Sequence, residues 1–280
     1  MKNAEYIVVN DGSEDNSLEI IEKLASEDNR ITVISQKHNG ISAAYNKAIN
    51  IARGKYIYFT DENCLLKDNF MEEAFNKAES NSLEVLCFEE NGDNKIISGD
   101  NLLMFYVHNE LSPYVIGSKL FLKEFIQKNK IAFDERISRS NQIFVPLLTV
   151  NAKRTLVENN CYIAFNNSKE SKKNNGYTAD DFAEYFMIYT ILSSKSIVSD
   201  YSETAKKAIS EISRDIYYIS NDIYMNLSNE QAKKVNEILP IEFKPLFFNT
   251  RELRNIKTSA TYRVGDKLTN LPRKILNKSK

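Results

Sequence analysis

The sequence of 280 residues contains no tryptophan, two histidines, three cysteines, eight glycines and five prolines. The cysteines are odd in number, lie far apart and form no Cys-x-x-Cys pair (Cys64, Cys87 and Cys161). This pattern argues against a disulfide framework and fits a reducing compartment. His38 and His108 are too few and too far apart in the sequence for a histidine-rich zinc site.

Long apolar runs are also missing. No stretch of about 18 apolar residues occurs, and the N-terminus has no basic segment followed by an apolar one. We therefore expect neither secretion nor a membrane-spanning helix. Hydrophobic residues make up 42% and charged residues 27% of the chain, which is typical of a globular protein. A length of 280 residues is enough for one large domain or for one domain plus an appendage.

The net charge of −1 is unevenly distributed along the chain. Residues 251–280 hold nine Lys or Arg and two acidic residues, so this tail carries +7 and the rest carries −8. Such a tail is typical either of binding to an anionic partner, such as a membrane surface, or of a solvated charged end. Only Tyr262 lies among these cations as an aromatic residue, so we expect no nucleic-acid binding.

The first 90 residues alternate between short β-branched or aromatic runs and helical periodicities. Strands are predicted at 6–11, 31–34, 56–60 and 83–88, and helices at about 18–25, 41–52 and 70–78. Strict alternation of this kind predicts an α/β domain with a parallel sheet and helices on both faces.

The remaining chain is less regular. It predicts helices near 118–129 and 143–151, a strand at 162–165, and a helical region whose apolar stripe belongs to a core (Phe182, Tyr185, Phe186, Tyr189 and Leu192). We therefore divide the chain into an α/β domain at 1–166, a polar linker at 167–178, a helical region at 179–249 and a basic tail at 250–280.

Two of the predicted strands end in acidic residues, Asp11 after the first and Asp61-Glu62-Asn63 after the third. The carboxyl ends of strands form the ligand crevice of an open α/β sheet, so these ends suggest a nucleotide and a metal. Asp11 can accept a base N–H or cap the next helix. Asn39 and Gly40 open a helix whose N–H groups can face a diphosphate, or they form a plain turn.

Three segments in order and spacing resemble family 2 glycosyltransferases of GT-A fold: YIVVNDGSEDNS, HNGISAAYNKAI and ARGKYIYFTDEN. The likeness covers about residues 5–166. It implies an enzyme that transfers a sugar from a nucleoside diphosphate donor, a UDP-sugar, to a polysaccharide or lipid-linked acceptor. It further implies that Asp11, Asn39, Gly40 and Asp61 bind the nucleotide sugar. Asp61 and Asn63 would hold Mn²⁺ or Mg²⁺.

The sequence departs from the family pattern at three places. Asn63 replaces the second metal-binding aspartate, and the site loses a negative charge. Asn141 stands at the position of the catalytic base and cannot take a proton, while Asp134 and Glu135 are the nearby carboxylates that can substitute for it. The family's first strand would precede Tyr6, so we expect a sheet that lacks this strand and has unpaired edges.

These departures favour an alternative function, a catalytically inactive relative or gene remnant with a binding or assembly role. A dinucleotide-dependent oxidoreductase also explains the alternating pattern, but the sequence lacks its Gly-x-Gly-x-x-Gly motif. For the enzyme we expect a cytoplasmic location, peripheral at the inner face of the cell membrane, with residues 251–280 on anionic lipid.

Overall fold

The computed structural model describes residues 3–60, 64–89, 92–159, 163–165, 176–198 and 200–239. The chain divides into two compact units, residues 1–172 with 184–217 and residues 173–183 with 218–280. The boundary between the units falls within helices α7 (Ala179–Val198) and α8 (Glu203–Asn226). The division predicted from the sequence, at residues 166, 178 and 249, stays a prediction.

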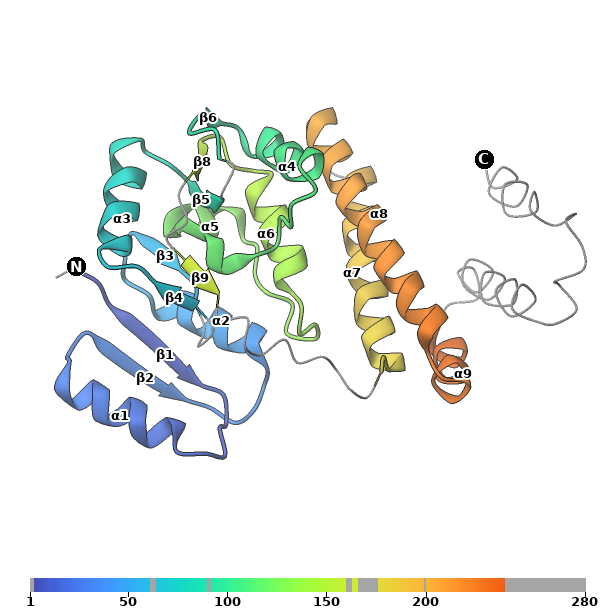
Figure 1. The fold of residues 1–280 in the computed structure, drawn as a ribbon, viewed down its shortest axis with the longest axis horizontal. Helices are drawn as coiled ribbons and strands as arrows, with labels where there is room; N and C mark the ends of the chain where they lie inside the picture. Colours follow the sequence, from blue (N-terminus) through green and yellow to red (C-terminus); the bar gives the residue numbers. More distant parts are fainter. Residues whose placement is uncertain are drawn as a thin grey trace, which may run out of the picture. The chain divides into compact units, whose positions relative to one another are not determined.

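The N-terminal elements follow the predicted alternation (Figure 1). They are β1 (Tyr6–Asn10), α1 (Ser17–Glu27), β2 (Ile31–Ser35), α2 (Ile41–Ile51) and β3 (Tyr56–Tyr58). Strands β1 and β2 pair in parallel over their full length. Helix α2 starts after Gly40, whose φ of 88° lies in the left-handed region that favours glycine.

Within the described residues, the main sheet has five strands in the order β3-β7-β5-β8-β6. Its further members are β5 (Val85–Glu89), β6 (Ile96–Ile97), β7 (Lys119–Leu122) and β8 (Thr155–Asn159). Only β5 and β8 pair in parallel, whereas β7 is antiparallel to both β3 and β5, and β6 is antiparallel to β8. The prediction of a parallel sheet is therefore wrong for this part of the chain.

Strand β7 also corrects the helix predicted at 118–129. A single 3₁₀ turn η1 (Ile116–Ser118) precedes β7, and only α5 (Lys123–Asn129) is helical. The run Lys119–Leu122 contains buried side chains between two neighbouring strands, and tertiary pairing decides its conformation. Short apolar runs of this length have no periodicity that distinguishes a strand from a buried helix.

The other elements of this unit complete the fold. They are α3 (Phe70–Ser80), α4 (Gly99–His108), α6 (Asn141–Thr149), and strand β4 (Cys64–Leu66), which pairs antiparallel with β9 (Ile163–Phe165). Helices α3 and α6 confirm the helices predicted near 70–78 and 143–151, and β9 confirms the strand predicted at 162–165. The sequence did not predict α4, β4, β6 or β8.

The two N-terminal strands form a sheet of their own. Among the described strands, β1 pairs with β2 alone and β3 pairs with β7 alone, so each has one edge without a partner strand. Asn10 is the only buried residue of β1, and α1 has no buried residue. The missing first strand expected from the sequence stays a prediction.

Aromatic rings fill the core between α2, α6 and the main sheet. The rings of Phe133 and Phe144 stack at 4.0 Å between centroids, and Phe59 packs edge-on against both. Tyr45 of α2 contacts Phe59 and Phe133, each at 5.0 Å between ring centroids. This core fixes the start of the segment between α5 and α6, which carries part of the candidate site.

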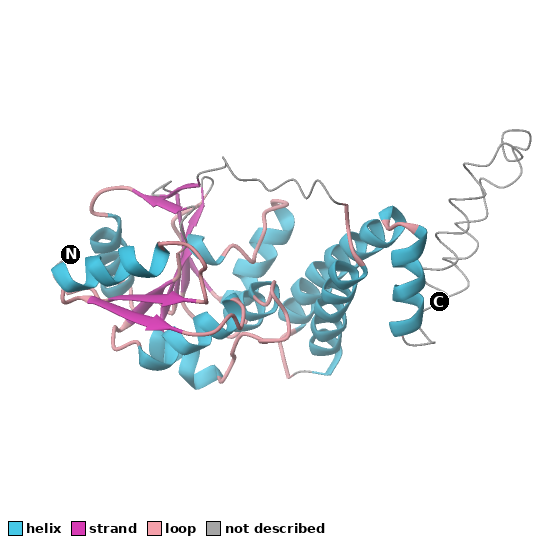
Figure 2. Ribbon diagram, turned by 90° about the horizontal axis from the view of Figure 1, so that it is seen from below, coloured by secondary structure: helices cyan, strands magenta, loops and turns pink. Residues whose placement is uncertain are grey.

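The C-terminal described helices are α7, α8 and α9 (Asn229–Ile238). Helices α7 and α8 lie side by side in both views (Figure 2), and Ile188 and Leu192 of α7 share a buried cluster with Ile209 and Ile212 of α8. The stripe predicted for α7 is confirmed as core, because Phe182, Phe186 and Leu192 are buried and Tyr185 and Tyr189 pack on a core cluster. Within the described ranges, no helix combines the length and apolar character needed to cross a membrane.

Candidate functional site

Asp11 follows β1 and ties this strand to the loop before α2. Its carboxylate accepts hydrogen bonds from Gln36 Nε2 at 2.8 Å, from the backbone N–H of Asn39 at 2.8 Å, and from that of Gly40 at 2.9 Å. His38 Nδ1 lies 3.0 Å from the second carboxylate oxygen of Asp11. One side chain therefore organises the whole loop at residues 36–40.

These contacts determine the charge of Asp11. Burial would raise its pKa, but the hydrogen bonds from Gln36, Asn39 and Gly40 lower it below the ordinary value. The two loops also approach closely here, since a Cβ at Gly12, where φ is 77°, would lie 2.9 Å from His38 N. The carboxylate therefore stays ionised at neutral pH and stabilises the start of α2.

The structure brings three of the predicted binding residues together. Asp11, Asn39 and Gly40 meet at the carboxyl end of β1 and the N-terminus of α2. The backbone N–H groups of Asn39 and Gly40 donate to Asp11, and the role of the N–H groups at the start of α2 toward a diphosphate stays a prediction. Asp11 caps neither helix: its bonds go to Asn39 and Gly40, which precede α2, and before α1, the next helix in the sequence, Ser17 N donates to Asp15 instead.

A hollow of about 160 Å³ opens beside these residues. Residues from the start of α2, from η1, from the segment 133–140 and from the start of α6 line it (Ile41, Ser42, Tyr45, Ile116, Phe133, Ser138 and Asn141). Three parts of the chain that lie far apart in the sequence, the start of α2, η1 and residues 133–141, therefore form one small concave site with aromatic, aliphatic and hydroxyl groups.

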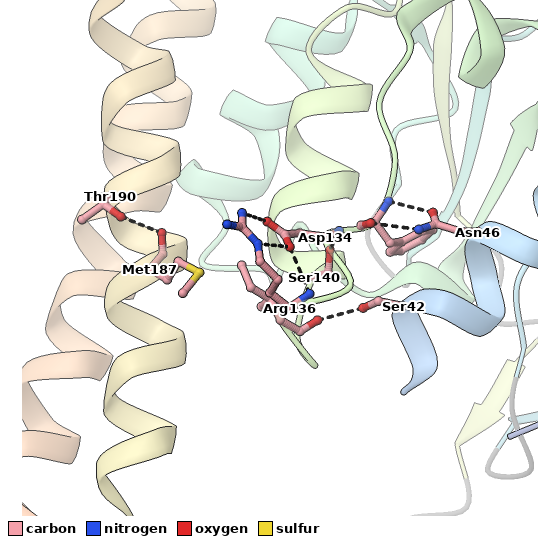
Figure 3. A network of polar contacts seen from close by, with 9 residues as sticks. Ser42, Asn46, Asp134, Arg136, Ser140, Met187 and Thr190 are labelled. Carbon is pink, nitrogen blue, oxygen red and sulfur yellow. Dashed lines mark hydrogen bonds and ion pairs between the residues drawn. The ribbon is translucent and has the colours of Figure 1, made fainter. Parts of the chain in front are cut away.

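The segment 133–140, which we call the hinge loop, is held against α2 by side-chain hydrogen bonds (Figure 3). Asn46 donates to Phe133 O at 2.9 Å and accepts from Phe133 N at 3.0 Å. Ser42 Oγ donates to Ile137 O at 2.8 Å, and Asp134 N donates to Ser140 Oγ at 2.5 Å. The polar groups of α2 thus fix the geometry of the hollow.

The two carboxylates named as substitutes for the base have partners of their own. Asp134 binds the Arg136 guanidinium at 2.9 and 2.6 Å, and these bonds lower its pKa despite partial burial. Glu135 accepts from Asn46 Nδ2 at 3.0 Å. Neither residue lines the hollow. A lowered pKa weakens a general base, so Asp134 is poorly suited to remove a proton here.

Asn141 lies at the start of α6 and lines the hollow. Its Nδ2 donates to the carbonyl oxygen of Tyr114 at 2.9 Å. A carboxylate at this position has no proton to donate and would face that carbonyl oxygen. The amide therefore fits this place better than the aspartate that the family resemblance implies.

The predicted metal ligands Asp61 and Asn63 lie outside the described residues. Within the described part of the chain, no group of three or more His, Cys, Asp or Glu is arranged to hold a metal ion. The donor types are nevertheless suitable, since carboxylate and amide oxygens are the ligands that Mg²⁺ and Mn²⁺ prefer.

Sequence reasoning missed several residues of the site. Ser42 lies two positions after Gly40, in the segment HNGISAAYNKAI that the family resemblance identified. Its position at the start of a helix predicted to bind the donor could therefore have marked it as a site residue. Ile116 and Ser138 carry no comparable signal, because only the packing of η1 and the hinge loop against α2 brings them to the hollow.

Residues 1–127 match the model of the family described as glycosyl transferase family 2. The match covers less than half of the 280-residue chain. The matched residues contain Asp11, the loop at residues 36–40, α2 and Ile116. The hinge loop and Asn141 lie beyond the matched residues, although they complete the hollow.

Curated relatives resemble parts of the chain. EpsH of Bacillus subtilis is 33% identical over 149 residues, which cover 49% of this chain and 43% of that protein. Glycosyltransferase GlyG of Streptococcus pneumoniae is 36% identical over 86 residues, 30% of this chain and 29% of GlyG. The matches thus span less than half the length of these relatives.

The similarity in fold extends further. The crystal structure of S. aureus TarS 1-349 in complex with UDP-GlcNAc superposes with a TM-score of 0.65 at 18% identity, covering 90% of this chain and 80% of TarS. This likeness confirms the predicted GT-A-type α/β fold followed by a helical region.

Proposed function

We propose that the chain is a glycosyltransferase that moves a sugar from a UDP-sugar donor to a polysaccharide or lipid-linked acceptor. The observation that carries the proposal is the hollow at the start of α2, which follows the loop at residues 36–40 that Asp11 binds. Four of its seven lining residues lie within the part of the chain that matches family 2. GlyG is named a glycosyltransferase, and the TarS structure holds UDP-GlcNAc, which supports a nucleotide-sugar donor.

The size of the hollow suggests which part of the donor it holds and which part lies outside it. Its volume of about 160 Å³ is below the range of roughly 300–1,000 Å³ typical of small-molecule sites. The hollow then takes the sugar, next to Tyr45 and Asn141, while the nucleotide lies over the loop at residues 36–40. In this arrangement Asp11 orders the nucleotide side of the site and Asn39 and Gly40 line it.

A divalent cation completes the proposed site. Asp61 and Asn63 would hold Mn²⁺ or Mg²⁺, which when bound neutralises the charge of the diphosphate leaving group. With one carboxylate instead of two, we expect weaker cation binding than a pair of aspartates gives.

A second candidate function is a relative that binds the donor without transferring the sugar. The contact between Asn141 Nδ2 and Tyr114 O favours it, because a neutral amide occupies the position expected for the base. For either function we propose a cytoplasmic protein, peripheral at the inner face of the cell membrane. Its basic tail, residues 251–280, lies outside the described residues.

Titration of the chain with UDP, with and without Mn²⁺, tests the proposed donor site. We expect metal-dependent binding that Asp61→Ala abolishes, with Asp68→Ala, which removes an exposed carboxylate seven positions later in the sequence, as the control. Binding that is absent, or that Asp61→Ala leaves unchanged, contradicts the assignment. Release of UDP from a UDP-hexose then separates the two candidates, since only the transferase is expected to release it.

A further inference from the structure

The hinge loop has a second anchor outside α2. Glu184 of α7 accepts hydrogen bonds from the backbone N–H groups of Ser138 and Arg139, the latter at 3.1 Å. The Arg139 guanidinium forms an ion pair with the same carboxylate. Figure 3 shows α7, marked by Met187 and Thr190, next to the loop that these contacts hold.

The surroundings of this contact make it a strong one. The Glu184 side chain is 14% exposed and that of Arg139 is 32% exposed. Burial would raise the pKa of Glu184, but the hydrogen bonds from Ser138 and Arg139, together with the charge of Arg139, lower it. The Arg139 guanidinium also lies 5.0 Å from the centroid of the Tyr185 ring. Charge-assisted bonds of this kind are shorter and stronger than neutral ones.

The position of Glu184 connects the helical region to the hollow. Ser138 lines the hollow, and its backbone N–H donates to Glu184. Asn141, three positions later in the sequence, lines the same hollow. On the other side, Ser42 holds Ile137. The hinge loop is therefore fixed between α2 and α7, and loss of the Glu184 bonds leaves it fixed from one side only.

We propose that Glu184 is a positioning residue for the hollow, so that helix α7, which lies outside the matched family 2 residues, shapes the part of the site that takes the sugar. This inference rests on the proposed function and deepens it. Glu184 acts through Ser138 and Arg139, and it does not itself line the hollow. The sequence of α7 does not distinguish Glu184 from a glutamate on a solvent-facing side of a helix. Its partners Ser138 and Arg139 lie 46 and 45 positions away, so no local pattern identifies the contact.

The test compares the full-length chain with Glu184→Gln and with a matched control, Glu211→Gln. Glu211 pairs with Arg214 within α8, so its substitution removes a similar ion pair without touching the hinge loop. Amide hydrogen exchange is measured over residues 134–142, and affinity is measured for both UDP and UDP-GlcNAc. Arg139→Gln serves as a second variant, which removes the ion pair but keeps the carboxylate for both N–H groups.

Glu184→Gln is expected to speed exchange at Ser138 and Arg139 by at least about tenfold, the ratio expected when bonds to a charged group weaken. The dissociation constant for UDP-GlcNAc should rise by roughly five- to tenfold on the same ground, while that for UDP stays unchanged. Arg139→Gln should give a smaller change in exchange at Ser138, and Glu211→Gln should give none.

Two results overturn the inference. One is exchange over residues 134–142 that is the same in Glu184→Gln and wild type, and the other is an equal loss of affinity for UDP and UDP-GlcNAc. A wild-type chain that binds neither ligand overturns the proposed function, and with it the effect on the sugar. The exchange comparison still decides separately whether Glu184 holds the loop.

Discussion

At the scale of single residues, Asp11 carries more of the site's structure than its place in the sequence indicates. Its carboxylate satisfies two N–H groups before α2 and the Gln36 amide. The sequence predicted both a nucleotide role and a capping role for it. The capping role is wrong, because Asp11 bonds to the loop at residues 36–40 and no side chain caps α1. The nucleotide role stays a prediction.

Asp11→Asn is expected to lower the free energy of unfolding at pH 7 by about 1–3 kcal/mol, since an amide offers one acceptor oxygen where the carboxylate offers two. The folded-state pKa of Asp11 lies below its unfolded value, which is about 3.9. Its stabilisation is therefore present above the unfolded pKa and is lost as pH falls through the folded one.

Urea unfolding of wild type and Asp11→Asn at pH 7 and at pH 3 measures this effect. The difference between the two proteins should shrink at pH 3. Glu14→Gln, an exposed substitution in the same turn, controls for the change in net charge. A difference that is the same at both pH values would show that the carboxylate's charge is not the source of stability.

Asn141→Asp tests whether the amide is a structural requirement. The variant loses the bond from Nδ2 to Tyr114 O and places a carboxylate near that carbonyl oxygen. We expect the free energy of unfolding at pH 7 to fall by about 1–3 kcal/mol and UDP release from a UDP-hexose not to increase.

Asn151→Asp is the matched control for this variant. Asn151 Nδ2 donates to Leu147 O at the other end of α6, so the same type of bond is lost away from the hollow. Chemical denaturation and a UDP-release assay measure the two properties. A gain of UDP release in Asn141→Asp alone would mean that the substitution restores the base.

At the scale of elements, local patterns predicted the N-terminal alternation well and the later sheet poorly. Strands β1 and β2 and helices α1 to α3 each have a periodicity that matches their conformation. Strand β7 lies between β3 and β5 although it follows both in the sequence, and this order depends on long-range pairing. Its four residues give too short a pattern to compete with the helical pattern of α5.

The contact between α2 and the hinge loop yields a prediction at the same scale. Asn46→Ala removes the two bonds to Phe133 and the bond to Glu135, which leaves backbone groups at a partly buried site without partners. We expect a loss of about 2–4 kcal/mol in the free energy of unfolding, because each unsatisfied buried group costs about 1–3 kcal/mol.

Asn50→Ala, one turn further along α2 and exposed, gives the control for helix propensity. Thermal and urea unfolding of both variants measure the difference. Equal stability of Asn46→Ala and Asn50→Ala would contradict the claim that α2 holds the hinge loop.

At the scale of the whole molecule, the candidate site is assembled from parts that the sequence treats separately. The matched family residues end at 127, but the hollow needs Phe133, Ser138 and Asn141, and the hinge loop is held by Glu184. The sequence predicted the first half of the site from motifs. The second half depends on tertiary packing, which leaves no local signal in the chain.

The central claim is that a nucleotide sugar binds at the start of α2, between the loop at residues 36–40 and the hinge loop. Hydrogen exchange of the full chain, with and without saturating UDP-GlcNAc and Mn²⁺, tests it most directly. The account predicts protection confined to residues 36–46 and 133–142 and to the segment around Asp61. Protection elsewhere, or no protection at a ligand concentration that saturates binding, would contradict it.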